Sequence, residues 1–248
     1  MIQIEGLSKR LGAKQVLEDL NLELPTGLTT VILGRSGTGK SVLLKHIIGI
    51  MHPDEGRIVV DGEDIAQLGE NDLNRVRRRF GMLFQGAALF DSLSVGENIA
   101  LPMREHLRLE EAEIHRRVAE RLSWVGLQGV EDMKPSSLSG GMKKRVGLAR
   151  AVAIDPAYIL YDEPTTGLDP IMSDVINELI RSLQKRMNVT SVVVTHDLHS
   201  AWKVGDRVAL LHEGRVQFTG TPAEAEVTTD MLVRQFIAGR SEGPVAAV

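Results

Sequence analysis

The feature that most constrains this chain is the segment Gly34-Arg35-Ser36-Gly37-Thr38-Gly39-Lys40-Ser41, which fits the pattern G-x-x-x-x-G-K-[ST] at every position. An apolar run precedes it and a helical pattern follows it, so a buried strand should enter the loop and a helix should leave it. Such a loop turns backbone N–H groups toward phosphate oxygens, and the following helix adds its N-terminal dipole. A Rossmann-type turn does not require Lys-Ser directly after its last glycine. The segment therefore predicts a phosphate-binding loop in an α/β fold.

Two residues at the end of this loop carry specific chemistry. Lys40 would bring a mobile positive charge to the β- and γ-phosphates of a nucleotide. Ser41 would offer its hydroxyl to Mg²⁺. We therefore expect residues 34–41 to bind ATP together with Mg²⁺.

Short apolar runs alternate with helical patterns along most of the chain, as in a mostly parallel sheet flanked by helices. The opening differs, because strands at 2–7 and 16–24 are joined by the short segment Lys9 to Gly12, which predicts an antiparallel start. We expect further strands at 29–33, 57–61, 81–84, 158–161, 190–195, 208–212 and 216–219, and helices at 41–50 and 110–125. No strand is expected between 94 and 153. The chain is thus predicted to be one domain, with an α/β core at 1–91 and 155–220, a helical insertion at 92–154 and a tail at 221–248 that ends in a flexible stretch, 241–244.

The strand expected at 158–161 ends in two carboxylates, Asp162 and Glu163. Ligands bind at the carboxyl ends of parallel strands in α/β sheets, so both side chains can turn toward one ligand there. Asp162 would hold the Mg²⁺ shell, directly or through water. Glu163 would polarise the attacking water and accept its proton. An Asp-Glu pair is also a common exit from a strand, and it becomes a strong signal only beside the phosphate loop.

Four further motifs accompany these two. They are Gln85 after the strand 81–84, Leu138-Ser139-Gly140-Gly141-Met142 before a helical run, Gly167-Leu168-Asp169-Pro170 after the acid pair, and His196 after the strand 190–195. The order resembles that of the ABC ATPases over nearly the whole chain, and these segments match the Q-loop, the signature motif, the D-loop and the switch histidine. The resemblance implies an α/β P-loop NTPase core of the RecA-like type, with an antiparallel β subdomain and an inserted helical subdomain.

The resemblance also implies a homodimer with shared sites. Ser139, Gly140 and Gly141 of one copy would contact ATP bound at Lys40 of the other, so that ATP binding closes the dimer. Ser139 also fits the N-cap of the following helix, and both interpretations can hold because a helix N-terminus binds anions. The resemblance also implies that Asp169 contacts the nucleotide and that Gln85 binds Mg²⁺ together with Ser41 and Asp162. The catalytic residues it implies are Glu163, His196, Lys40 and Gln85.

Composition limits where such a protein can act. The formal net charge of −4 argues against a nucleic-acid partner, since such binders usually carry a basic balance or a basic face. There are no cysteines, which fits a reducing compartment. We expect no signal peptide at the N-terminus, and no run approaches the roughly 18 apolar residues that span a bilayer. If the protein works at a membrane, another chain must hold it there.

A finer resemblance, to the Mla/Mce lipid-transport ATPases, rests on residues 82–93, 97–106 and 233–239, with Gly243-Pro244-Val245 following. It implies a peripheral subunit on the cytoplasmic face of the inner membrane that moves phospholipid or a related hydrophobic lipid. Its partners would be an integral membrane permease and a lipid-binding Mce-type protein. An importer of small polar nutrients and a soluble ABC ATPase remain as alternatives. The sequence shows neither the long coiled-coil insertion nor the second cassette that mark repair and translation members of the soluble class.

Two surface segments bear on these partners. The apolar run Ala87-Ala88-Leu89-Phe90 would form a groove for a coupling helix of the permease, or else an ordinary buried turn. The basic residues Arg75, Arg77, Arg78 and Arg79 fit a solvated helix face. Attraction to anionic lipid headgroups, worth ~1 kcal/mol per charge near the surface, is the alternative for this basic run.

The chain departs from the ABC pattern at one position. These ATPases commonly stack adenine on an aromatic residue just after the first strand, where this sequence has Leu11. No Phe, Tyr or Trp occurs before Phe80, so this segment cannot supply the stack. We therefore expect weak discrimination between ATP and GTP.

Overall fold

The computed structural model describes residues 1–240, 242 and 243. The chain divides into two compact units, one formed by Met1–Gln67 and Val193–Val248 and the other by Leu68–Val192. Strand β8 (Thr190–Thr195) begins in the second unit and ends in the first. Residues 241 and 244–248, which include part of the expected flexible stretch and of the match at 243–245, lie outside the described residues.

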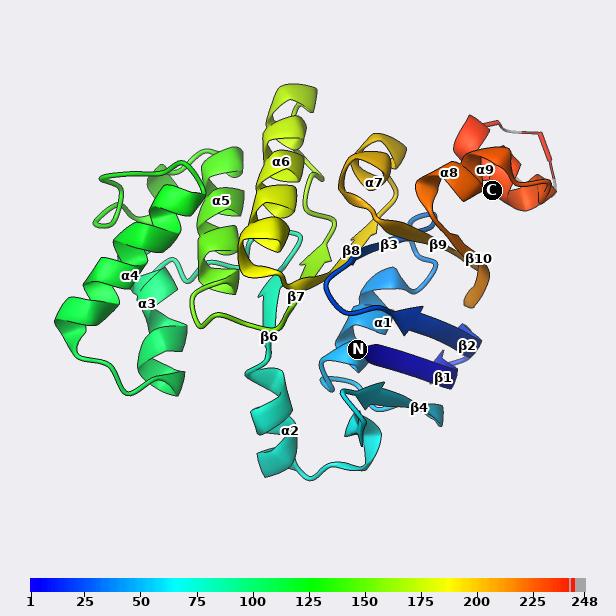
Figure 1. Ribbon diagram of the computed structural model, residues 1–248, viewed down its shortest axis with the longest axis horizontal. Helices are drawn as coiled ribbons and strands as arrows, with labels where there is room; N and C mark the ends of the chain where they lie inside the picture. The colour runs from blue at the N-terminus through cyan, green and yellow to red at the C-terminus, as the bar shows by residue number, and fades with distance from the viewer. Residues whose placement is uncertain (241, 244–248) are drawn as a thin grey trace. The chain divides into compact units, whose positions relative to one another are not determined.

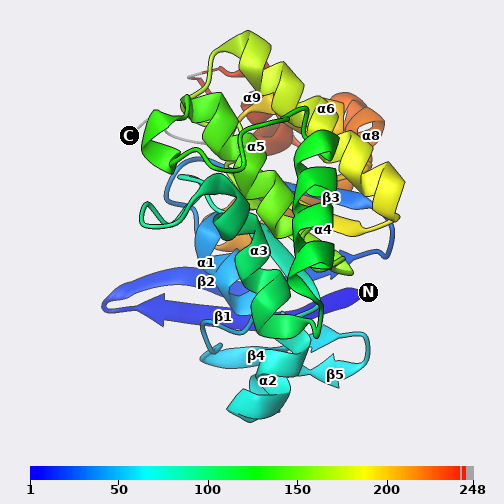
Figure 2. The same cartoon turned by 90° about the vertical axis from the view of Figure 1, so that its left-hand side faces the viewer.

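The first unit contains an antiparallel sheet in the strand order β2-β1-β4-β5, of which β5 is labelled in Figure 2 and the other three strands in Figure 1. In the central strand β1, Ile4 lies opposite Leu22 of β2 on one side and opposite Ile58 of β4 on the other. All three side chains are buried, because successive residues of a strand point to opposite faces and these share the covered face. The strands are β1 (Ile2–Leu11), β2 (Lys14–Leu24), β4 (Glu55–Val60) and β5 (Glu63–Asp64).

The same unit contains the strand that leads into the phosphate loop. Strand β3 (Thr29–Leu33) is buried along its whole length, as expected of a parallel strand covered on both faces. It runs parallel to β9 (Arg207–His212), which is antiparallel to β10 (Arg215–Gly220). The helices of this unit are α1 (Lys40–Ile47), α7 (Leu198–Val204), α8 (Pro222–Val227) and α9 (Met231–Ala238), with a 3-10 turn at Ile65–Gln67.

The second unit is mainly helical. Its parallel strands β6 (Phe80–Leu83) and β7 (Tyr158–Asp162) place the rings of Phe80 and Tyr158 in a stack with centroids 4.9 Å apart. Helices α3, α4 and α5 pack against one another (Figure 2). The helices are α2 (Glu70–Arg77), α3 (Val95–His106), α4 (Glu111–Trp124), α5 (Gly140–Ala151) and α6 (Pro170–Met187), with a 3-10 turn at Pro135–Ser137.

Local sequence sets the ends of these helices. Ser94 caps α3 and forms a reciprocal capping box with Glu97. Helix α6 begins with Pro170 in its first turn, where the missing N–H costs nothing, and ends at Asn188 in the left-handed conformation.

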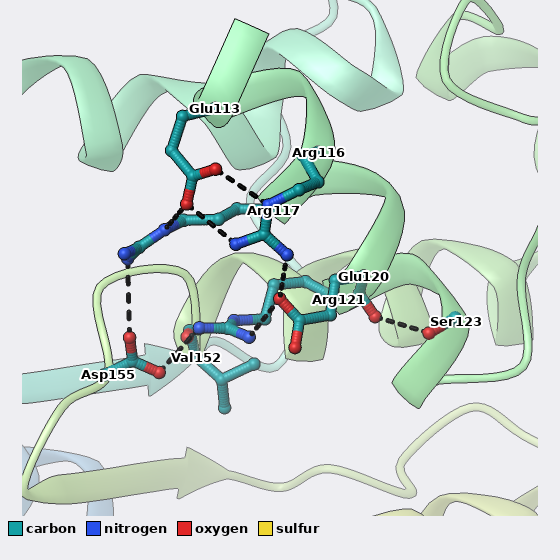
Figure 3. Close-up of polar contacts among 8 residues, drawn as sticks. All are labelled: Glu113, Arg116, Arg117, Glu120, Arg121, Ser123, Val152 and Asp155. Carbon is teal, nitrogen blue, oxygen red and sulfur yellow. Dashed lines mark hydrogen bonds and ion pairs between the residues drawn. The ribbon is translucent and has the colours of Figure 1, made fainter. Parts of the chain in front are cut away.

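A buried arginine anchors α4 within the second unit (Figure 3). The Arg121 guanidinium donates to the carboxylate of Asp155 (2.6 Å) and to the carbonyl of Val152 (3.1 Å), both of which follow α5. It also lies over the ring of Trp124 at 4.0 Å, and Arg186 of α6 lies over the same ring at 4.8 Å. Three helices of the helical part are therefore tied together near the end of α5.

The structure confirms the predicted strands and the helix at 110–125, with differences at their ends. Strand β1 continues to Leu11, so the antiparallel connection is shorter than expected and consists of Gly12 and Ala13. The expectation of no strand between 94 and 153 is also correct, since all of these residues are described. The basic run is not one helix face, because α2 ends at Arg77 and leaves Arg78 and Arg79 beyond it. The subdivision of the chain at 91, 154 and 220 stays a prediction.

In the part of the chain that the structure describes, none of the helices has the length and apolar character needed to cross a bilayer.

Candidate nucleotide-binding and hydrolysis site

The phosphate loop lies between β3 and α1 of the first unit, as predicted. Lys40 is the first residue of α1 and is 5% exposed, and its ammonium donates to the carbonyl oxygens of Gly34 (2.8 Å) and Arg35 (3.0 Å). Gly39 precedes it with a φ of 100°, and a Cβ at this position would lie 3.0 Å from a carbonyl oxygen of β2. Glycine alone accommodates both that backbone and that contact, so the loop stays tight around its lysine.

The rest of the loop presents polar groups to solvent. Arg35, Ser36 and Gly37 form an exposed outer turn, which the Thr38 hydroxyl closes by donating to the Arg35 carbonyl (2.9 Å). Ser41 is exposed in the first turn of α1. The exposed turn and the exposed Ser41 therefore lie at the N-terminus of α1, where the helix dipole favours an anion.

The acid pair lies at the end of β7 in the second unit. Asp162 is the last residue of the strand and is half-buried, whereas Glu163 is 9% exposed and has a φ of 48°. This left-handed backbone is unfavourable for a residue with a side chain, and it persists where the surroundings hold it. Thr166 does so twice, since its N–H donates to the Glu163 carbonyl (3.3 Å) and its hydroxyl to Glu163 Oε2 (3.2 Å).

A lysine that the sequence did not single out joins Glu163 to Gln85. Lys144 of α5 is 5% exposed, and its ammonium donates to the carbonyl oxygens of Gln85 (2.5 Å) and Glu163 (3.2 Å). Burial lowers the pKa of Lys144, and the nearby carboxylates of Asp162 and Glu163 oppose that shift. Gln85 itself is exposed just after β6, so its side chain is accessible while its backbone is held.

The signature and D-loop motifs both occur as helix N-termini. Ser139 caps α5 by accepting the N–H of Met142 (3.2 Å), which confirms it as an N-cap. Ser139 and Gly140 are exposed and Gly141 is buried. The Asp169 carboxylate caps α6 by accepting the first two free N–H groups of that helix, at 2.9 and 3.0 Å. The expected contacts of these residues with a nucleotide stay a prediction.

His196 lies in the first unit, exposed, directly after β8. The next residue, Asp197, caps α7 by accepting the N–H groups of His199 (3.0 Å) and Ser200 (3.2 Å). The switch-histidine position is therefore a fixed junction between a strand end and a helix start.

The predicted site residues fall into two sets. The first unit holds 34–41 and His196, and the second holds Gln85, 139–141, the acid pair and Asp169. Within the second unit the structure brings Gln85 and Glu163 to one ammonium. That the two sets meet around one nucleotide stays a prediction.

Sequence reasoning missed Lys144, Arg150 and Thr166. One signal was available for Arg150, the cation that ends the otherwise apolar stretch 146–149, whereas Lys144 lies in the cationic run 143–145 and was not distinguished from its neighbours. Thr166 offered no such signal.

A groove of about 880 Å³ lies in the second unit beside the segment that follows Gln85. Phe90, which is 52% exposed, and Ala88 line it, whereas Ala87 is buried and Leu89 does not contribute. The amide side chain of buried Asn98 fixes the Phe90 backbone by accepting its N–H (2.8 Å) and donating to its carbonyl (3.1 Å). Other apolar lining residues include Phe80, Phe84, Leu101 and Pro102, and the charged lining residues are Arg77, Arg78 and Arg150 and the single carboxylate Glu105.

The position of the missing adenine stack is the exposed end of β1, where Leu11 is 43% exposed. Because an aromatic–base stack is worth ~1–3 kcal/mol, its loss should make GTP an effective competitor of ATP. We expect Leu11→Tyr to raise the preference for ATP over GTP by about tenfold. Inhibition of ATP hydrolysis by GTP measures this, with Leu28→Tyr, another exposed leucine of the same unit, as the control. A strong ATP preference in the unaltered chain would contradict the prediction.

Comparison with known proteins places these motifs in a family context. The family model described as ABC transporter matches residues 17–166. The chain is 42% identical to the intermembrane phospholipid transport system ATP-binding protein MlaF of Haemophilus influenzae, over 99% of this chain and 93% of that protein. It is 43% identical to the probable ribonucleotide transport ATP-binding protein mkl of Mycobacterium leprae, over 98% of this chain and 70% of that protein.

Solved structures show the same architecture. The dimeric post-hydrolysis structure of the ATP-binding cassette MJ0796 bound to ADP and Pi matches with a TM-score of 0.82 and 33% identity, covering 89% of this chain and 98% of that one. The structure of cbiO1 from Clostridium perfringens, part of the ABC transporter complex cbiONQ, matches with a TM-score of 0.84 and 31% identity, covering 94% and 93%.

Proposed function

This chain belongs to the ABC transporter family and is an ATPase, and from that premise we propose that it drives the transport of phospholipid or a related hydrophobic lipid across a cell envelope. The observation that supports a phospholipid cargo is the 42% identity to a phospholipid-transport ATP-binding protein over 93% of that protein's length. The chain would act as a peripheral subunit on the cytoplasmic face of the inner membrane, bound to a separate permease and to a lipid-binding Mce-type protein.

ATP binds at the phosphate loop in this proposal. The ammonium of Lys40 moves from the loop carbonyls to the β- and γ-phosphate oxygens, and backbone N–H groups of residues 34–41 surround the remaining phosphate oxygens. The α1 dipole favours the same negative charge. The tight loop around Gly39 supports this role, because a Cβ there would collide with β2 and force the loop to shift.

The residues that would hold Mg²⁺ are Ser41, Gln85 and Asp162. A hydroxyl, an amide oxygen and a carboxylate are the hard oxygen ligands that this ion prefers, and it usually adds substrate phosphates rather than a full set of protein ligands. When bound, Mg²⁺ supplies neutralisation of the charge that develops on the phosphates.

Hydrolysis uses Glu163 as the base that orients and deprotonates the attacking water. The Thr166 hydroxyl donates to one oxygen of this buried carboxylate and so helps to orient it toward the water. His196 assists by contacting the γ-phosphate from its junction after β8. Both assignments are carried over from the family motifs that these positions match.

The site is completed by a second copy of the chain. Ser139 and Gly140 present an exposed helix N-terminus, which binds anions by its free N–H groups and its dipole. In the closed homodimer this end of α5, with Asp169 nearby, faces the ATP bound to the partner copy. ATP thereby favours the closed state, and hydrolysis reopens it.

The groove beside Phe90 would receive a helix of the permease. Its aromatic floor and three arginines suit an amphipathic helix with acidic residues. We expect Phe90→Asp to abolish copurification with the permease while ATP binding is retained, since the new carboxylate would be desolvated against apolar residues. Ile50→Asp, an exposed apolar residue of the first unit, is the control. Unchanged assembly of the Phe90 variant would contradict the groove assignment.

The test of the proposal is a pull-down from gently solubilised native membranes with tagged Glu163→Gln as the bait, followed by mass spectrometry of proteins and lipids. An integral membrane permease with a lipid-binding partner and phospholipid would support it. A permease with a binding protein for a sugar, amino acid or ribonucleotide would overturn the lipid cargo. Recovery of no membrane protein by a folded, ATP-loaded bait would favour a soluble ABC ATPase.

One observation favours a different cargo. The relative from Mycobacterium leprae, which is as similar to this chain, carries the name of a probable ribonucleotide transport protein. Small polar solutes therefore remain the second candidate, and the pull-down separates the two.

A further inference from the structure

One face of α5 holds the segment 85–88, which we term the Q segment. Lys144, Gly147 and Arg150 recur every three residues and so lie on the same side of the helix. Lys144 donates to the carbonyl of Gln85 (2.5 Å), and Arg150 donates to the carbonyls of Ala87 (2.7 Å) and Ala88 (2.8 Å). Gly147 lies between these two cations and lets α5 pack closely against β6 and the Q segment. A Cβ at this position would lie 2.7 Å from the Leu83 side chain of β6 and 3.3 Å from the Cβ of Ala87.

The Q segment is held in an unfavourable backbone conformation. Ala87 and Ala88 are both left-handed, with φ of 61° and 47°, which residues with a Cβ rarely adopt. Such a backbone persists only when neighbouring groups fix it. The guanidinium of Arg150 helps to fix it by binding the two successive carbonyls, and the N–H of Ala87 adds a bond to the Phe84 carbonyl (2.8 Å).

Lys144 extends this contact to the hydrolytic carboxylate. The same ammonium that holds the Gln85 carbonyl also donates to the carbonyl of Glu163, at 3.2 Å. Glu163 is itself left-handed, so the direction of its side chain depends on the groups that fix its carbonyl, among them Lys144 and the N–H of Thr166. The Lys144 ammonium is buried, so breaking its hydrogen bond to either carbonyl would leave a donor without a partner and without water. This penalty keeps the ammonium in place between the two carbonyls.

We propose that Lys144 is a positioning residue for ATP hydrolysis: by binding the Gln85 and Glu163 carbonyls together, it makes the orientation of the Glu163 carboxylate depend on the position of the Q segment. The inference rests on the proposed function, in which Glu163 orients the attacking water. It adds a mechanical link inside one copy of the chain, separate from the contacts across the dimer.

The link begins at the partner groove. Ala88 and Arg150 belong to both the Q segment contact and the groove lining. An occupant of the groove would therefore touch the same arginine that fixes the Q segment. If the occupant moved Arg150 when it bound or left, the Q segment would shift with that arginine. The shift of the Gln85 carbonyl would displace the Lys144 ammonium, and with it the carbonyl of Glu163.

The test compares Lys144→Met, which keeps the stem and removes the charge, with Lys144→Arg, which keeps a buried donor. Steady-state ATP hydrolysis should show kcat lowered at least about tenfold by Met, with KM for ATP within about twofold, because misplacement affects chemistry rather than phosphate binding. Arg should restore part of kcat. Lys143→Met, a half-exposed neighbour on the same helix, is the matched control and should stay near the parent rate.

A second measurement separates positioning from folding and from dimer closure. In the Glu163→Gln background, Lys144→Met should leave the ATP-dependent dimer, followed by sedimentation, unchanged. Loss of that dimer, a kcat within twofold of the parent, or an equal loss in Lys143→Met would each overturn the inference. If Lys144→Met does not fold, Lys144→Leu, which also lacks a donor, is measured in its place against the same criteria.

The two hypotheses fail in distinguishable ways. Normal turnover by Glu163→Gln would remove the proposed base and the Lys144 inference with it. An inactive Glu163→Gln together with a fully active Lys144→Met would leave the proposed function standing and overturn only the link.

Discussion

Glu163→Gln should lower steady-state ATP hydrolysis by at least about 100-fold, the range in which a positioned general base contributes. The amide keeps the size and the contact with the Thr166 hydroxyl but cannot accept the proton of the attacking water. ATP binding should be retained, because the phosphate loop of the first unit is untouched. Release of phosphate and equilibrium binding of ATP are the two measurements.

The same variant should also change the assembly of the protein. With hydrolysis blocked, ATP and Mg²⁺ should hold two copies together, whereas ADP should not. Glu110→Gln, at an exposed N-cap of the same unit, is the control for loss of a carboxylate. Turnover close to that of the parent would show that another group is the base.

Lys40→Met should abolish hydrolysis and also weaken ATP binding by at least about tenfold. The Lys40 ammonium is buried in the loop, whereas Arg35, the other cation of residues 34–41, is exposed. Lys40 is the residue assigned to the β- and γ-phosphates, so its loss should weaken nucleotide binding. Fluorescence titration with a nucleotide analogue measures the affinity. The contrast with Glu163→Gln is diagnostic, because one variant should lose binding and chemistry and the other chemistry alone.

Lys45→Met is the matched control for this second prediction. Lys45 lies on the same helix but is exposed, so its replacement should leave affinity and turnover near those of the parent. If Lys40→Met bound ATP as tightly as Lys45→Met, the phosphate loop would not be the site of nucleotide binding.

The parts that sequence predicted well are those set by neighbours in the chain. The loop 34–41 contains its own glycines, lysine and helix start, so strand, loop and helix follow from one stretch. Strands β3, β7 and β8 were predictable because each is a short, largely apolar run that is almost wholly buried. The N-cap role of Ser139 also followed from local pattern alone.

The parts that sequence did not predict depend on long-range packing. The bonds of Lys144 to Gln85 and Glu163 join residues far apart in the chain, and a lysine after the signature motif reads equally well as an exposed charge. The left-handed backbone at Ala87 and Ala88 has no sequence signal, since alanine does not favour it. The early end of α2, at Arg77, lies within a charged run that continues without a helix breaker.

The central claim is that ATP hydrolysis by this chain moves phospholipid, and reconstitution of its membrane complex tests it most directly. The complex copurified with the chain would be placed in proteoliposomes with labelled phospholipid and, in parallel, with labelled ribonucleotide, each with the parent chain and with Glu163→Gln. The account predicts ATP-dependent movement of the phospholipid with the parent and none with Glu163→Gln. ATP-dependent movement of the ribonucleotide without movement of the phospholipid would contradict it.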